Sequence, residues 1–403
     1  MAEQHGKTLV PQIRFAGFTD PWEQRKLSDL TDRVSIQSSD SDLPQVEYED
    51  IIPGEGTLNK DLRDKKGGKT GIKFYAGDVL YGKLRPYLMN WLYPQFNGVA
   101  VGDFWVLRAT ECDSSFLYRL VQTGSFQRLA NVSSGSKMPR ADWNLISQSF
   151  FAVPADHAEQ KAIAKGLAEL DTLITLHQRK YDKLCVLKKS MLDKMFPKGG
   201  SLYPEIRFAG FTDPWEQRKL GDVARRVTRK NENRDSDLPL TISAQYGLVD
   251  QRTFFNNQVA SKDMSGYFLL HKGEFAYNKS TSTDSPWGAI KRLEKYDMGC
   301  VSTLYICFEL LSGDPDFLVT YYETDRWYKA VQLIAAEGAR NHGLLNITPD
   351  DFFETQICIP KRIDEQRQIG AFFDRLDSLI TLHQRKLELL RNIKKSMLDK
   401  MFV

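Results

Sequence analysis

The chain has few cysteines, no long apolar run and little net charge, and each absence excludes a class of protein. Its 403 residues include 5 scattered cysteines with no Cys-x-x-Cys pair. This pattern argues against a disulfide framework or a zinc site and favours free thiols in a reducing compartment. No apolar run approaches the roughly 18–20 residues of a membrane span, and the first residues lack the apolar core of a signal peptide. We therefore expect a cytoplasmic protein.

The net charge of +3 gives little indication of a polyanionic partner. Local basic clusters occur at Lys83/Arg85, at Arg225, Arg226, Arg229 and Lys230, and at Lys291/Arg292. They could form a basic face for nucleic acid, or belong to an ordinary solvated surface of mixed charge. Composition alone leaves both interpretations open.

The sequence also lacks the short motifs of common catalytic sites. It has no Gly-x-x-x-x-Gly-Lys-[Ser/Thr] phosphate loop and no Gly-x-Gly-x-x-Gly turn after a strand, and its 6 histidines form no ligand cluster. Asp64-Lys65-Lys66 matches a nuclease pattern that is too short to be specific. Asp-Pro-Trp occurs at 20–22 and 213–215. It resembles part of a methyltransferase motif, but we interpret it as a turn followed by a tryptophan of the domain core. We expect no catalytic site, metal or cofactor in this chain.

An internal repeat is the most informative feature that is present. Ile13–Leu27 (IRFAGFTDPWEQRKL) recurs unchanged as Ile206–Leu220, and LITLHQRK and KKSMLDKMF each recur near the end of both halves. The spacing between equivalent residues grows from 193 at Trp22/Trp215 to 206 at Pro154/Pro360. We infer one fold copied twice. Its constant flanks make the same contacts in both copies, and its variable middles, about 28–155 and 221–361, meet different targets.

A long helix is expected at the end of each half. Apolar residues recur at spacings of four and three from Ile163, and proline is absent until Pro197, as in the a/d stripe of a coiled coil. Asp156 and Glu159 have the spacing of a capping box. The stripe predicts that the two helices pair antiparallel about a pseudo-two-fold axis. Its residues are Ile163, Leu167, Leu170, Ile174, His177, Tyr181 and Leu184 in the first helix and Ile369, Phe373, Leu376, Ile380, His383, Leu387 and Leu390 in the second.

Alternatives to this pairing remain open, because each helix could pack only on its own domain or pair with another chain. His177 and His383 lie on the stripe, where a polar residue more often fixes register than binds a metal. A second apolar set lies partly off the stripe and offers a surface for another protein. It comprises Leu173, Leu176 and Leu187, matched by Leu379, Leu382 and Ile393.

Each variable region predicts a compact α+β domain. Short runs rich in β-branched and aromatic residues, such as 98–109 and 298–310, are separated by Gly, Pro, Asn and Ser turns. Helical stretches are expected near Phe116–Ala130 and Phe317–Ala335. The predicted fold class is therefore α+β, with two tandem duplicated domains separated by long helices that pair as an antiparallel coiled coil. The expected order is a first domain at 1–155, a long helix at 156–197, a second domain at 198–361 and a second long helix at 362–403.

In its order of constant and variable regions, the chain resembles the DNA-specificity subunits of type I restriction-modification systems. The resemblance covers essentially the whole chain. It rests on the repeated segments, on Glu159-Gln160 and Glu365-Gln366, and on the phrases GDVLYGKLRPYL and GAIKRLEKYDMGCVSTLY. It implies two target-recognition domains that each read one half of an asymmetric, bipartite site in double-stranded DNA. It also implies that the constant helices dock two modification (methyltransferase) subunits. S-adenosylmethionine would then bind in that partner, and the motor and nuclease would reside in a separate restriction subunit.

Polar loops of the variable regions are the candidate DNA contacts, because polar side chains read base edges while Lys and Arg hold phosphates. Each of these residues has an equally good interpretation as an ordinary loop residue. The candidates are Lys83, Arg85, Tyr87, Ser134, Ser136, Lys137 and Arg140 in the first domain, and Asn278, Lys279, Ser280, Thr281, Ser282, Arg340, Asn341 and His342 in the second.

Two other functions remain open. A non-enzymatic coiled-coil scaffold could use its duplicated domains to bind protein or glycan, and salt-dependent DNA affinity would separate DNA recognition from that role. A self-sufficient methyltransferase would need a cofactor motif that the sequence lacks. Binding of S-adenosylmethionine by the isolated chain would favour it.

Overall fold

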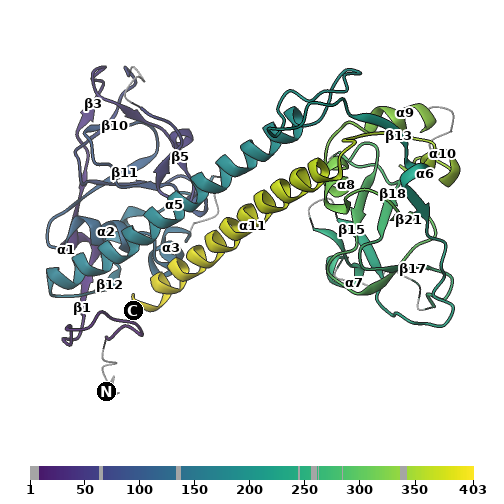
Figure 1. Ribbon diagram of the computed structural model, residues 1–403. Helices are drawn as coiled ribbons and strands as arrows, with labels where there is room; N and C mark the ends of the chain where they lie inside the picture. The colour runs from purple at the N-terminus through teal and green to yellow at the C-terminus, as the bar shows by residue number, and fades with distance from the viewer. Residues whose placement is uncertain are drawn as a thin grey trace. The chain divides into compact units, whose positions relative to one another are not determined.

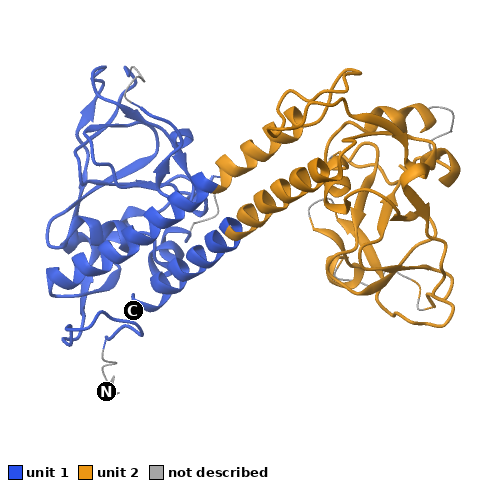
Figure 2. Ribbon diagram, viewed as in Figure 1, with its two compact units in different colours: residues 1–180, 383–403 blue, residues 181–382 orange. Residues whose placement is uncertain are grey.

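The structure is a computed structural model that describes residues 9–62, 67–132, 138–243, 246–255, 261, 263–283, 285–335 and 343–403. It divides into two compact units, shown in different colours in Figure 2. Unit 1 contains residues 1–180 and 383–403, and unit 2 contains residues 181–382. Each unit therefore combines one α+β domain with parts of both long helices (Figure 1).

Unit 1 is built on two four-stranded sheets. Its elements are β1 (Glu23–Lys26), α1 (Leu27–Leu30), β2 (Thr31–Val34), β3 (Gln37–Ser38), β4 (Gln45–Val46), η1 (Tyr48–Asp50), β5 (Ile51–Ile52), β6 (Thr57–Leu58), β7 (Gly71–Phe74), β8 (Val79–Gly82), η2 (Pro86–Leu88), β9 (Trp91–Leu92), β10 (Gly98–Ala100), β11 (Phe104–Ala109), α2 (Ser114–Leu120), α3 (Gly124–Ala130), α4 (Trp143–Gln148), β12 (Phe150–Val153) and the start of α5 (His157–Lys194). One sheet has the order β2-β11-β8-β9 and the other β3-β7-β10-β4, and β1 pairs with β12.

Unit 2 repeats the four-stranded sheet β2-β11-β8-β9 and the two-stranded sheet β1-β12 of unit 1. Its elements are β13 (Glu216–Lys219), α6 (Leu220–Val223), β14 (Ala224–Arg226), β15 (Leu240–Ser243), β16 (Gly247–Asp250), α7 (Gln251–Phe255), β17 (Phe268–His271), β18 (Phe275–Asn278), β19 (Ala289–Arg292), β20 (Met298–Val301), β21 (Ile306–Leu310), α8 (Pro315–Tyr321), α9 (Tyr328–Ala335), α10 (Pro349–Phe353), β22 (Gln356–Ile359) and the start of α11 (Ile363–Lys400). The sheet β14-β21-β18-β19 matches β2-β11-β8-β9, and β13–β22 matches β1–β12.

The strand register confirms that one α+β fold is used twice. Glu23 pairs with Val153 in unit 1, and Glu216 pairs with Ile359 in unit 2. Glu216 lies 193 positions after Glu23, and Ile359 lies 206 positions after Val153, which are the spacings that the sequence repeat shows. The differences in length between the copies therefore lie between the two paired strands of each unit, in the variable regions.

Each predicted helical stretch of the variable regions is divided into two short helices. In unit 1 the division is at Thr123, whose hydroxyl donates to the carbonyl of Leu120 and accepts from the N–H of Phe126. Thr324 makes the same bond back to the carbonyl of Tyr321 in unit 2. A threonine in this role ends one helix and can begin the next. The helical stretches expected near Phe116–Ala130 and Phe317–Ala335 are therefore present, each interrupted by a short turn.

Within each unit, segments of α5 and α11 run antiparallel. In unit 1, Asp171 of α5 forms an ion pair of 2.7 Å with Lys394 of α11. In unit 2 the repeat-equivalent residues exchange helices, and Lys188 of α5 lies 2.6 Å from Asp377 of α11. All fourteen residues of the predicted stripe are buried or half-buried. No helix among the described residues has the length and apolar character needed to cross a membrane.

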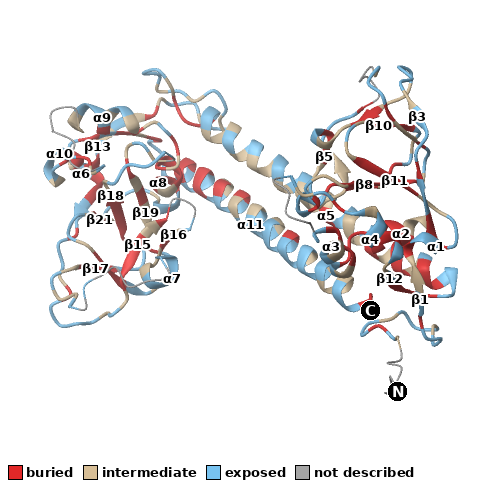
Figure 3. Ribbon diagram, turned by 180° about the vertical axis from the view of Figure 1, so that it is seen from behind, coloured by how far each residue is buried: buried red, intermediate tan, exposed pale blue. Residues whose placement is uncertain are grey.

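The repeated Met-Phe at the end of each long helix explains why the flanks are constant. Phe402, at the end of α11, packs in the core of unit 1 with its ring 6.1 Å from that of Trp22. Phe196, at the end of α5, packs in the core of unit 2 with its ring 5.8 Å from that of Trp215. Figure 3 shows that buried residues fill these domain cores but occupy only part of each long helix.

A buried carboxylate joins the start of each half to the start of its long helix. The carboxylate of Glu159 accepts bonds from the guanidinium of Arg14 at 2.6 and 2.7 Å and from the indole N–H of Trp22 at 3.2 Å. Glu365 binds Arg207 and Trp215 in the same way. Glu159 therefore does not complete the capping box that was predicted with Asp156, because its side chain turns to the preceding domain. Asp156 still caps α5 through the N–H of Ala158.

Removing the guanidinium of Arg14 is expected to destabilise unit 1 strongly. In Arg14→Met the carboxylate of Glu159, whose side chain is 2% exposed, keeps only the indole N–H of Trp22. Leaving one member of a buried pair uncompensated costs about 3–5 kcal/mol of unfolding free energy. Denaturant unfolding measures this loss. Arg25→Met is the matched control, because Arg25 lies 3.6 Å from Glu23 at the surface and its loss should cost under about 1 kcal/mol. Equal losses in both variants would contradict the expectation.

His177 and His383 meet on the paired helices within unit 1. Their Nδ1 atoms lie 2.8 Å apart, so one ring must donate a proton and the other accept it. Burial of the ring, followed by the nearby His383, Lys386 and Lys180, lowers the pKa of His177 below its ordinary value of about 6.5. The contact is a hydrogen bond between polar stripe residues, as expected for residues that fix the register of a helix pair.

The lowered pKa predicts that acid weakens the helix pair. The unfolded chain takes up the His177 proton at a higher pH than the folded chain does. The contribution of neutral His177 to the stability of the fold is therefore complete above about pH 6.5, and it is lost as the pH falls through the folded-state pKa of this residue. Thermal unfolding between pH 8 and pH 5 should show a smaller pH dependence in His177→Gln than in the native chain. His157→Gln, at an exposed position at the start of α5, should keep the native dependence.

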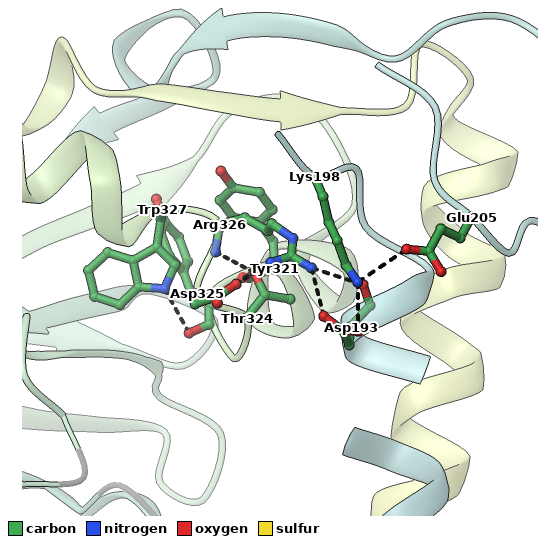
Figure 4. A network of polar contacts seen from close by, with 9 residues as sticks. Asp193, Lys198, Glu205, Tyr321, Thr324, Asp325, Arg326 and Trp327 are labelled. Carbon is green, nitrogen blue, oxygen red and sulfur yellow. Dashed lines mark hydrogen bonds and ion pairs between the residues drawn. The ribbon is translucent and has the colours of Figure 1, made fainter. Parts of the chain in front are cut away.

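A polar network anchors the end of α5 within unit 2 (Figure 4). Arg326, in the turn between α8 and α9, donates to the carbonyl of Asp193 at 2.9 Å and lies 3.3 Å from its carboxylate. Lys198 bridges the carboxylates of Asp193 and Glu205 at 2.6 and 3.2 Å. The hydrogen bond from Lys198 is the main reason that the pKa of Asp193 is lowered. The helix end is thus held to the domain by charge pairs as well as by Met195 and Phe196.

Candidate nucleic-acid interface

The fold brings the two candidate segments of the first domain together. Residues 83–85 continue from β8 and pair antiparallel with residues 139–141 through a bridge between Leu84 and Arg140. The N–H of Arg85 donates to the carbonyl of Pro139, and the N–H of Ala141 donates to the carbonyl of Lys83, both at 2.8 Å. Segments more than 50 residues apart in the sequence therefore form one short ribbon.

Asp103 organises the cations of this ribbon. Its carboxylate lies 3.5 Å from the ammonium of Lys83 and 3.0 Å from the guanidinium of Arg140. Lys83 is half-buried, whereas Arg85 and Arg140 are exposed. Beneath the ribbon, burial raises the pKa of Tyr48, whose hydroxyl donates to the carbonyl of Asp103 and accepts from the N–H of Leu84. The ribbon therefore presents a net positive charge at the surface, and the hydroxyl of Tyr48 holds its backbone in place from below.

The second domain has the equivalent ribbon with different side chains. Residues 279–281 continue from β18 and pair with residues 343–345 through a bridge between Ser280 and Leu344. Thr281 donates both its N–H and its hydroxyl to the carbonyl of Gly343, at 2.8 and 3.0 Å. Ser280, Thr281 and Ser282 are exposed, and the side chain of Asn278 accepts from the N–H of Ser280 at 3.0 Å. This surface offers hydroxyl groups where the first offers cations.

Lys279 differs from the other candidates in where its ammonium group is used. It donates to the carbonyl of Ile347 at 3.1 Å, and burial lowers the pKa of the side chain. A half-buried amine bonded to a backbone carbonyl serves first to hold the ribbon in place. The remaining candidates, Ser134, Ser136, Lys137, Arg340, Asn341 and His342, lie outside the described residues, as do Asp64, Lys65 and Lys66.

The other basic clusters are largely neutralised by carboxylates. Arg225 pairs with Glu309 at 2.5 Å, and Arg229 pairs with Glu274 at 2.7 Å. Arg292 contacts both Glu294 and Asp316, and Lys291 lies 3.8 Å from Glu323. These contacts favour the interpretation of a mixed-charge surface over a basic face at these positions.

Sequence reasoning missed Asp103 and Tyr48. Neither lies in a candidate loop, because Asp103 precedes β11 and Tyr48 lies in η1. The alternation of apolar and polar residues does not show which distant backbone a hydroxyl will reach. Gly82 is a weak signal, since an added Cβ there would lie 2.4 Å from the ring of Tyr48. Over the part of the chain that the structure describes, no three His, Cys, Asp or Glu side chains gather as a metal site would require.

The second apolar set of the long helices is exposed. In unit 1, Leu173 and Leu176 of α5 are 43% and 45% exposed, and Ile393 of α11 is 38% exposed. In unit 2 the repeat-equivalent residues exchange helices, so that Leu379 and Leu382 belong to α11 and Leu187 to α5, with exposures of 44%, 46% and 39%. We call these sets of three residues the unit 1 patch and the unit 2 patch. Exposed apolar patches of this kind mark surfaces for protein partners.

Comparison with known proteins adds independent information. Residues 212–392 match the family model described as the type I restriction modification DNA specificity domain. A segment of 135 residues, 32% of this chain, is 27% identical to the type I restriction enzyme EcoDI specificity subunit of Escherichia coli. That segment spans only 30% of the length of this curated relative.

A solved structure shows the same fold over nearly the whole chain. The S subunit of a type I restriction-modification system from M. genitalium aligns with a TM-score of 0.61 and 13% identity. The alignment covers 98% of this chain and 99% of that one. The duplicated α+β architecture with long helices is therefore a known one. Together with the family-model match over residues 212–392, it shows that the chain is similar to the DNA specificity subunits of type I restriction-modification systems.

Proposed function

We propose that this chain is the DNA-recognition subunit of a type I restriction-modification complex. Its domains, at 1–155 and 198–361, would read the two halves of an asymmetric, bipartite site in double-stranded DNA in the cytoplasm. The observation that carries the proposal is the pair of equivalent ribbons, 83–85 with 139–141 and 279–281 with 343–345. They occupy the same place in both copies of the fold but present cations in one and hydroxyls in the other. An identical pair would read a palindrome, whereas a differing pair reads two unlike half-sites.

The stripe and patch residues of the long helices divide two tasks between them. Residues such as Ile163, Leu167 and Phe373 are buried in the domain cores, which also receive the end of the opposite long helix, and would join the helices to the domains and to each other. The unit 1 and unit 2 patches are exposed and arise from repeat-equivalent residues, so they offer the same contact twice. Two equal contacts favour two copies of one partner. We assign them to two modification subunits, which supply S-adenosylmethionine and methyl transfer, while restriction subunits join the full complex. The helices would occupy 156–197 and 362–403.

The function can be tested by methyl transfer with separated subunits. The chain alone is expected to methylate and cleave nothing. With the modification subunit, DNA should become methylated at one asymmetric bipartite motif, and the particle mass should fit two partner copies. The affinity for DNA should fall steeply with salt, because bound phosphates release counterions.

Two results would contradict this function. Methyl transfer by the highly purified chain alone would place catalysis in this chain. A complex that binds no DNA at any salt concentration, but binds a protein or glycan through its domains, would favour the scaffold alternative.

A further inference from the structure

An apolar tip stands beside the cationic ribbon of the first domain. Tyr87, Leu88 and Met89 follow Arg85 and Pro86, and they are 54%, 41% and 42% exposed. Met138, on the segment that pairs with this region, is 52% exposed. Single exposed apolar residues are ordinary on a protein surface. Three in succession on one short turn are not, unless they serve a contact.

The tip is held rigidly at both ends. Pro86 is buried, and the carbonyl of Met89 accepts from the N–H of Gly54 at 2.9 Å. Arg85 and Met89 flank η2 with φ angles of 49° and 55°. These are two of the three positive-φ residues other than glycine in the described part of the chain. Such conformations persist only where the surroundings enforce them, and they concentrate at functional sites.

The charges around the tip indicate what it contacts. Lys83, Arg85 and Arg140 lie at its base, so its occupant should carry negative charge. DNA supplies that charge in its phosphates. An apolar side chain can read a base edge in the major groove only through the 5-methyl group of thymine, since the other groups there are hydrogen-bond donors and acceptors.

We propose that the tip formed by Tyr87, Leu88 and Met89 is a specificity determinant that reads thymine methyl groups in the half-site of the first domain. This inference rests on the proposed function and extends it to a base chemistry. The equivalent ribbon of the second domain carries the exposed hydroxyls of Ser280, Thr281 and Ser282 in place of an apolar tip. The two domains therefore read their half-sites by different chemistry, apolar contact in one and hydrogen bonding in the other.

Uracil substitution tests this proposal, because uracil differs from thymine only by the missing methyl group. Methylome sequencing first identifies the two half-sites, and exchange of residues 28–155 shows which of them the first domain reads. The complex with its modification subunit is then titrated with duplexes that carry uracil in one half-site or the other. Uracil in the first-domain half-site should weaken binding by about fivefold or more, at the low end for loss of one base contact. Uracil in the other half-site should change it less than about twofold.

Side-chain variants separate the tip from general effects. In Leu88→Ala combined with Met89→Ala, the duplexes with thymine and uracil should bind equally. Phe150→Ala, at a 60% exposed residue of β12, should keep the native preference for thymine. A first half-site without thymine, or native binding that is indifferent to uracil, would overturn the inference and leave the proposed function intact. Uniform weakening by the double variant with the thymine preference retained would also overturn it, and would instead indicate a wedge or a protein contact. If the complex binds no specific DNA, the proposed function itself fails.

Discussion

Exchanging residues 28–155 for the variable region of a relative should change one half of the recognised DNA site and leave the other half unchanged. The constant flank holds this region through backbone atoms as well as through core contacts such as those of Trp22 and Phe402 with Phe116. Gln160 accepts from the N–H of Asp113 and donates to the carbonyl of Pro154, both at 2.7 Å, and β1 pairs with β12 through a backbone ladder. Backbone partners persist when side chains change. Helix pairing and the two exposed patches lie outside the exchanged segment and should be retained.

The readout of this exchange is the methylated motif in DNA from a host that carries the variant and its modification subunit. The expected effect is complete replacement of one half-site at full methylation of the other. The reciprocal exchange of 221–361 is the matched control and should replace the opposite half-site. A change in both half-sites after either single exchange would show that the domains do not read DNA independently.

The sequence predicts the architecture well because the repeat and the stripe are periodic signals. Identical flanks required identical surroundings, and the structure supplies them in Trp22 with Phe402 and Trp215 with Phe196. The four-three spacing follows from helix geometry and needs no knowledge of the partner. Both signals depend on spacing along the chain, so a sequence can show them directly.

Contacts between distant segments could not be predicted in the same way. Glu159 has a capping-box position, yet it binds an arginine and an indole about 150 residues earlier in the chain, as does its repeat equivalent Glu365. A carboxylate satisfies either partner, and only the tertiary fold decides between them. The same limit applies to Lys279, whose ammonium group donates a hydrogen bond to the carbonyl of Ile347. Candidate DNA residues chosen by residue type alone therefore include groups that the fold uses internally.

Lengthening both long helices by one heptad should lengthen the unread gap between the half-sites. The ion pairs Asp171–Lys394 and Lys188–Asp377 fix the antiparallel register on which this expectation depends. Insertions after Lys180 and after Lys386 fall at repeat-equivalent positions, and seven residues keep the a/d stripe in phase. Seven residues add about 10 Å of helix, or roughly three base pairs at about 3.4 Å each. Each half-site should keep its sequence.

The control is an insertion of four residues in α5 alone. It turns the stripe of α5 out of phase with α11, so that residues such as Leu184 no longer face the pair, and modification should be lost. The methylated motif from host DNA is again the measurement. The Met-Phe pair at the end of each helix is packed in a domain core. Added residues therefore have to lengthen the helices, because the helix ends cannot shift along the domains. An active double-heptad variant with an unchanged gap would therefore show that something other than α5 and α11 sets the spacing.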